Sequence, residues 1–139
     1  MKKLLILFVL SAFLFSCGNR SGLDADSYEI IATEHIPGIE QYHIFYKGKN
    51  KSEKSLKQFI QQFREEKTEG DANISLYDDN SITHLATKFP LEPAEYLVIA
   101  DHFIAISGFS APDEILLYPY QNDTYKELGG SNWQVKPID

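Results

Sequence analysis

Asp101 and His102 are adjacent in this 139-residue chain and place a carboxylate beside an imidazole, a pair able to move protons. Together with Ser107, they form a candidate hydrolase site in which histidine would activate the serine hydroxyl. Neither G-x-S-x-G nor S-x-x-K, two common settings of a catalytic serine, occurs in the sequence. No H-x-H, H-x-x-x-H or HExxH spacing occurs either. We therefore expect no metal or other cofactor, and we keep a small hydrolase only as an alternative.

A second candidate site is a group of lysines between positions 47 and 57 of an otherwise acidic chain. The chain has a formal net charge of −7, so this local positive charge stands out. At the start of a helix, free backbone N–H groups would add to the positive potential. The group would bind an anionic partner, lipid head group or glycan, unless it is simply a solvated helix face. Its members are Lys47, Lys49, Lys51, Lys54 and Lys57.

Aromatic residues near the C-terminus form a third candidate site. Flat aromatic side chains on an edge strand and tail suit a sugar or peptide partner. They suit the closing of a small sheet core equally well. The residues are Tyr118, Tyr120, Tyr125 and Trp133.

The only cysteine of the chain, Cys17, follows an uncharged apolar run from Leu4 to Phe15. Lys2 and Lys3 precede this run, and a positive start followed by an apolar stretch is typical of a secretory signal. The run is shorter than the ~20 residues that a membrane-spanning helix needs. The sequence therefore predicts an exported protein rather than one with a permanent membrane span.

The residues before Cys17 resemble the lipobox of bacterial lipoproteins, with Ser16 directly before the cysteine and Leu14 three positions before it. The resemblance covers about the first nineteen residues. It implies that the sulfur of Cys17 receives a diacylglyceryl group, that the preceding peptide bond is cut, and that the new amine is acylated. Two or more acyl chains would hold the protein at a bilayer. In an organism with two membranes, Gly18 after the cysteine favours the outer membrane, facing the periplasm.

The expected organisation is a cleaved signal peptide (1–16), a lipidated cysteine with a tether (17–27) and a single domain (28–139). Residues 1–16 contain two lysines and no acidic residue, so the remaining chain has a formal charge of −9. This charge disfavours nucleic acid binding and self-association, and we expect a monomer. Because lipid consumes the only cysteine, the domain has none for disulfides or thiolate metal sites.

Hydrophobic spacing predicts an α+β fold. Residues Leu56, Phe59, Ile60 and Phe63 share one face of a long helix at about 51–67, which Asn50 and Glu53 would begin as a capping box and Gly70 would end. A short helix is expected at about 81–89. The first two expected strands are 28–36 and 42–46, joined through Pro37-Gly38. A third strand is expected at 73–77, and two more within 96–109, with a turn near Asp101-His102. The last is an edge strand at 115–120. These elements predict a mostly antiparallel sheet of about six strands, covered by the two helices, with an irregular tail at 124–139.

These patterns favour a non-enzymatic, lipid-anchored module that binds an envelope protein or glycan. A protective or inhibitory protein directed against a toxin or hydrolase is the first alternative, and the small hydrolase is the second. In each of these three cases, lipidated Cys17 would anchor the protein to the membrane.

The lipobox resemblance generates a direct test. Changing Cys17→Ser should abolish labelling by a fatty-acid probe and release the protein from membranes, because no thiol then remains to carry the lipid. Metabolic labelling and membrane fractionation measure the two effects. Continued labelling of the Cys17→Ser protein would refute lipidation at this residue.

Overall fold

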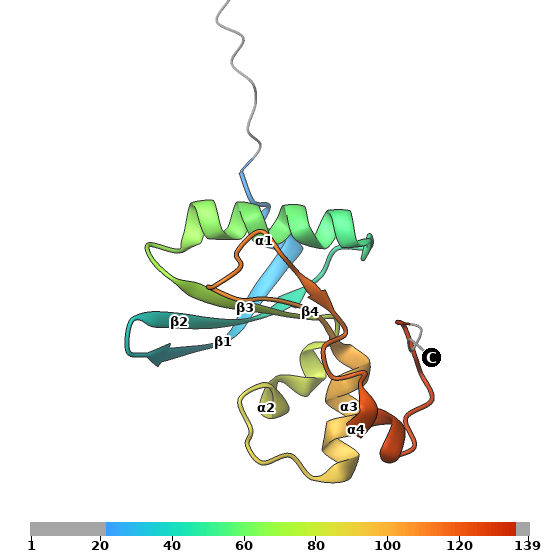
Figure 1. Cartoon of the computed structure of the whole chain (residues 1–139). Helices are drawn as coiled ribbons and strands as arrows, with labels where there is room; N and C mark the ends of the chain where they lie inside the picture. Colours follow the sequence, from blue (N-terminus) through green and yellow to red (C-terminus); the bar gives the residue numbers. More distant parts are fainter. Residues whose placement is uncertain (1–21, 136–139) are drawn as a thin grey trace, which may run out of the picture.

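The computed structural model describes residues 22–135, so the expected signal peptide and Cys17 lie outside the described residues. The described chain is an α+β fold built on one five-stranded sheet in the order β1-β2-β3-β4-β5. Helix α1 lies on one face of the sheet, and the smaller helices lie on the other (Figure 1). The elements are η1 (Ala25–Ser27), β1 (Tyr28–Ile36), β2 (Ile39–Tyr46), α1 (Glu53–Lys67), β3 (Ala72–Tyr77), η2 (Asn80–Ile82), α2 (Thr83–Ala86), α3 (Pro93–His102), β4 (Phe103–Ser107), β5 (Leu116–Leu117) and α4 (Asp123–Glu127).

The predicted hairpin is confirmed, and its loop is tighter than expected. Strands β1 and β2 pair antiparallel up to Ile36 and Ile39, so only Pro37 and Gly38 form the loop and β2 begins three residues earlier than position 42. Proline fixes its own φ, and Gly38 has a φ of 81°, which glycine adopts at little cost.

The long helix is also confirmed, but its first residues differ from the prediction. Ser52, not Asn50, is the N-cap, and its side chain accepts a hydrogen bond from the Ser55 backbone N–H. Asn50 instead accepts from the Ser52 N–H through its side-chain oxygen, so the predicted capping box with Glu53 is wrong. The helix ends at Lys67, before Gly70.

Helix α1 makes the sheet mixed rather than mostly antiparallel. It leads from β2 to β3, and these two strands pair in parallel, while the other three pairings are antiparallel. The sheet has five strands and not about six, because the first half of the region predicted as two strands is a helix.

That helix, α3, covers Pro93–His102 and leaves only β4 as a strand in the region 96–109. Glu92 and Glu95 form a reciprocal capping box, and Pro93 is placed where a missing N–H costs nothing. These start signals outweigh the β-branched composition that favoured a strand. Asp101 and His102 therefore end a helix instead of forming the predicted hairpin turn.

Three smaller predictions also need correction. The short helix covers only Thr83–Ala86 and ends before Phe89, the last residue of the predicted helix, which is 93% exposed. The last strand is reduced to Leu116–Leu117, although it does lie at the sheet edge as expected. The tail is not irregular throughout, because Asn122 caps the short helix α4.

Two hydrophobic clusters lie on the two faces of the sheet. The larger joins the four buried residues of α1 to Ile44, Tyr46, Ile74, Leu76, Ile104 and Ala105. The smaller joins Tyr77 and Phe103 to Ile82, Leu85 and Ile99 of the helical side. Within residues 22–135, no helix has the length and apolar character needed to cross a membrane.

The helix packing can be tested with matched substitutions. Phe63 is 0% exposed and contacts the rings of Tyr28 and Tyr42 edge to face, so Phe63→Ala should lower the free energy of unfolding by about 3–5 kcal/mol. Gln58→Ala, on the exposed side of the same helix, should change it by less than about 0.5 kcal/mol. Urea denaturation measures both values, and equal effects would contradict the assignment of the buried face.

Candidate functional site

A cleft of about 510 Å³ opens where the end of β3, the end of α3, β5 and the C-terminal segment meet. We call it the Asp78 cleft. Polar and apolar surface contribute about equally to its lining, and its side chains come from parts of the sequence that lie far apart. The lining residues are Lys51, Asp78, Asp101, His102, Leu117, Tyr118, Asn132 and Gln134.

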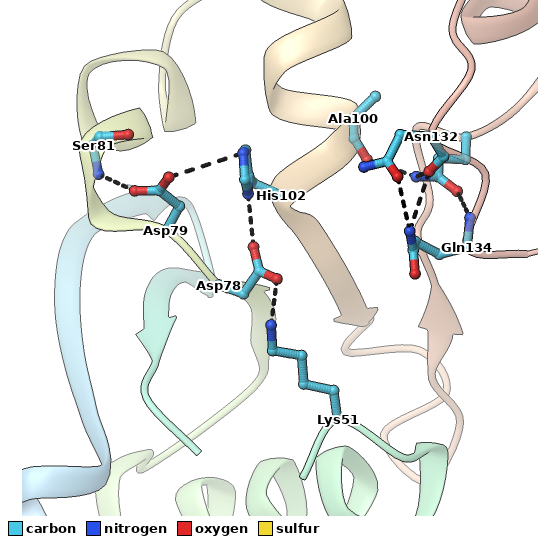
Figure 2. Close-up of polar contacts among 9 residues, drawn as sticks. Lys51, Asp78, Asp79, Ser81, Ala100, His102, Asn132 and Gln134 are labelled. Carbon is cyan, nitrogen blue, oxygen red and sulfur yellow. Dashed lines mark hydrogen bonds and ion pairs between the residues drawn. The ribbon is translucent and has the colours of Figure 1, made fainter. Parts of the chain in front are cut away.

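The carboxylate of Asp78 is held from two sides (Figure 2). Its Oδ2 lies 2.6 Å from Nζ of Lys51, and its Oδ1 lies 2.8 Å from Nδ1 of His102. The backbone N–H of Asp78 also donates to the carbonyl of His102, at 3.1 Å. Because only 15% of the Asp78 side chain is exposed, these contacts fix its position at the end of β3.

Asp79 lies near the other nitrogen of His102 but does not form a hydrogen bond with it. Its Oδ2 lies 3.9 Å from Nε2, beyond hydrogen-bond distance, while its Oδ1 accepts from the Ser81 N–H at 2.8 Å (Figure 2). Hydrogen bonds from Ser81 are the main cause of the lowered pKa of Asp79, and His102 contributes to it. Asp79 therefore stays ionised and holds η2 while leaving Nε2 of His102 available.

The opposite wall depends on Asp101 and Gln121. The hydroxyl of Tyr125 donates to Oδ1 of Asp101 and accepts from the Asn132 N–H at 2.9 Å. Gln121 donates to the carbonyl of Asn132 at 3.1 Å and accepts from the Gln134 N–H at 2.6 Å. These bonds place the C-terminal segment along the cleft.

Tyr118 lines the cleft in an uncommon backbone conformation. Its φ is 44°, in the left-handed region that non-glycine residues rarely adopt. Its N–H donates to Ile104 and its carbonyl accepts from the Gln121 N–H, so both backbone groups are paired. Burial, and to a smaller degree the carboxylate of Asp78, raises the pKa of the phenol. Its hydroxyl therefore remains protonated and can donate.

The structure does not bring the three predicted hydrolase residues together. Ser107 is 1% exposed, and its hydroxyl accepts from Arg64 at 3.0 Å and donates to the Pro112 carbonyl at 3.3 Å. Nδ1 of His102 bonds Asp78 instead of Asp101. Asp101 and His102 do share the cleft, at the end of α3.

Two of the five candidate lysines lie close to carboxylates. Lys51 belongs to the cleft, and Lys47 lies 3.7 Å from a carboxylate oxygen of Glu29. Lys49, Lys54 and Lys57 form no ion pair within residues 22–135. The local positive charge available to an anionic partner is therefore smaller than the sequence suggested.

Most of the aromatic candidate site closes the core. Tyr125 is 1% exposed and meets the ring of Trp133 edge to face. Tyr120 stacks on Tyr96 at 5.0 Å. Of the four candidates only Tyr118 lines the cleft, so the packing interpretation accounts for the other three.

Asp78, Asn132 and Gln134 line the cleft but were not among the candidate site residues of the sequence. Asp78 is separated in sequence by 27 residues from Lys51 and by 24 from His102, and no local sequence pattern predicts such pairs. The described residues contain no group of three or more histidine, cysteine or acidic residues able to hold a metal.

The contacts of Asp78 generate a stability prediction. Asp78→Ala removes the partner of both Lys51 and His102 in a partly buried site, so the free energy of unfolding should fall by about 1–3 kcal/mol. Lys51→Met removes only the more exposed partner and should cost less than about 1 kcal/mol. Thermal and urea denaturation measure both. Equal losses would mean that Asp78 does not organise the cleft.

No family model, no curated protein and no solved structure matches the chain. No similar protein therefore supplies a ligand for the cleft. Its chemistry is the guide to function, and that chemistry is one of hydrogen-bonding side chains held in fixed positions.

Proposed function

We propose that the chain is a lipid-anchored binding module of the bacterial cell envelope, and that the Asp78 cleft is its binding site. The supporting observation is the convergence of polar side chains from five parts of the chain on one cleft of about 510 Å³. A volume of this size is within the range of ligand pockets in proteins. Ion pairs hold side chains of the cleft in fixed positions without a ligand, and such preorganisation favours affinity.

Binding accounts for the cleft better than hydrolysis does. The lining residues include no serine, threonine or cysteine that could serve as a nucleophile. His102 directs Nδ1 at Asp78, whose other oxygen already bonds Lys51. The hydroxyl of Ser107 is engaged elsewhere, by Arg64 and Pro112. These contacts favour a role in holding a ligand.

The position of Leu23, near the start of the described residues, is compatible with a membrane anchor that leaves the cleft open. The N–H of Leu23 donates to both carboxylate oxygens of Glu66, at 3.1 and 3.0 Å, so the chain enters the domain beside the C-terminal end of α1. Lys51 of the cleft lies just before the N-terminal end of the same helix. At 1.5 Å per residue the two ends lie about 20 Å apart. A lipid on Cys17 would then hold the protein at the periplasmic side of the outer membrane with the cleft away from the anchor.

Photo-crosslinking in intact bacteria tests this function. The full chain would carry p-benzoylphenylalanine in place of Gln134, on the cleft, or in place of Gln58, on the exposed side of α1. We expect an envelope adduct from position 134 in the membrane fraction, and none from position 58. Adducts from both positions, or only from position 58, would contradict binding at the cleft. Recovery of the chain in the soluble fraction would contradict the anchor.

A further inference from the structure

We infer that the Asp78 cleft binds a neutral saccharide through its hydroxyl groups, an inference that rests on the proposed binding function. The first observation is that unused hydrogen-bonding groups of both kinds face the cleft. Asp101 uses Oδ1 for Tyr125 and keeps Oδ2 as an acceptor. Nε2 of His102 lies 3.9 Å from Oδ2 of Asp79, too far for a hydrogen bond. The Tyr118 hydroxyl has no hydrogen-bond partner within residues 22–135 and can both donate and accept.

The charges of the cleft disfavour a charged ligand of either sign. Lys51 is 2.6 Å from Asp78, so its charge is already paired, and an anion would also meet Asp101. A cation could pair with Asp101, but it would also meet Lys51 and the ring of His102, whose Nδ1 is already directed at Asp78. Charged ligands would have to displace these contacts and lose their own hydration.

The hydroxyl groups of a sugar match the unused hydrogen-bond donors and acceptors of the cleft. Each hydroxyl offers one donor and two acceptor sites, so neighbouring hydroxyls of a sugar can bond an acceptor such as Asp101 and a donor such as Tyr118 together. Leu117 and Tyr118 also supply apolar surface to the lining, against which the C–H groups of a sugar ring can pack.

A peptide, the other neutral ligand with both donors and acceptors, fits the cleft less well. Strand addition needs a ladder of free backbone groups, and β5 offers only two residues. A peptide side chain needs a deep apolar pocket as an anchor, whereas the apolar lining of the cleft consists of Leu117 and Tyr118. Leu116, the exposed apolar residue of β5, is 59% exposed and is not part of the lining.

The chain contains a built-in reporter for this test, because Trp133 is its only tryptophan. Trp133 lies between the lining residues Asn132 and Gln134, and its ring meets Tyr125 at a centroid distance of 4.9 Å. Tyr125 in turn bonds Asp101. Ligand contact with Asp101 or Asn132 should therefore change tryptophan fluorescence.

The experiment titrates the full lipidated chain, in a detergent without a sugar head group, with glucose, N-acetylglucosamine, maltotriose and chitotriose. We expect a saturable fluorescence change with at least one of them. Asp101→Asn and Tyr118→Phe should each raise the Kd by about threefold to tenfold, as expected for one hydrogen bond. Asn keeps an oxygen for Tyr125, and Phe keeps the ring, so both variants should remain folded. Gln58→Ala, on the exposed side of α1 outside the cleft, should leave the Kd unchanged.

Trialanine and inorganic phosphate serve as competing probes. If either binds, depends on Asp101 and no saccharide does, the saccharide inference is wrong while the binding function stands. If no saccharide changes the fluorescence but position 134 still crosslinks an envelope partner, the saccharide inference is again wrong. Saccharide binding that is unaffected by both cleft variants would also overturn it. Failure of the crosslinking alone contradicts the proposed function.

Discussion

Packing of α1 against one face of the sheet is the interaction on which the rest of the molecule depends. Leu56, Phe59, Ile60 and Phe63 are all buried there, and the helix must cross from the end of β2 to the start of β3 to bury them. This crossover makes β2 and β3 parallel, so both strands end at the same edge of the sheet. Lys51, between the end of β2 and the start of the helix, lies at that edge, where Asp78 follows β3. Clefts at the carboxyl ends of parallel strands commonly bind ligands in open α/β sheets.

The antiparallel entry of β4 completes the same edge. Phe103, its first residue, pairs with Tyr77, the last residue of β3, so the end of α3 must lie beside Asp78. Asp101 and His102 are consequently placed at the cleft by strand pairing and not by any local motif. The hydrogen bond from the Asp78 N–H to the carbonyl of His102 joins the two elements directly. One polar site thus results from two strand pairings and one helix, which explains why its residues are scattered through the sequence.

Local spacing of apolar residues predicts best those elements that have one apolar and one polar side or a clear turn signal. Helix α1 has one apolar and one polar side, and the β1–β2 hairpin has Pro37-Gly38 at its turn, so both were predicted well. Helix α3 was missed because its apolar residues surround the helix, with Ile99 buried and Val98 exposed, and give no helical period. The capping signals of Glu92, Pro93 and Glu95 were present in the sequence and could have corrected the prediction. The contacts of Asp78 had no such signal, since they depend on the completed sheet.

The conformation of Tyr118 shows that this part of the chain is constrained by more than local preference. A left-handed φ at a residue other than glycine costs of the order of 1–3 kcal/mol, and glycine or asparagine would adopt it more easily. The turn lets the chain leave β5 and carry Tyr120 back over the sheet, where it stacks on Tyr96 and meets Phe103 edge to face. That packing can offset the backbone cost, but it would follow equally from a glycine at position 118. What a tyrosine adds is its side chain, which packs partly on the α1 cluster and presents a protonated hydroxyl to the cleft. The side chain therefore accounts for a tyrosine at this position where the backbone does not, because only the side chain reaches both the core and the binding site.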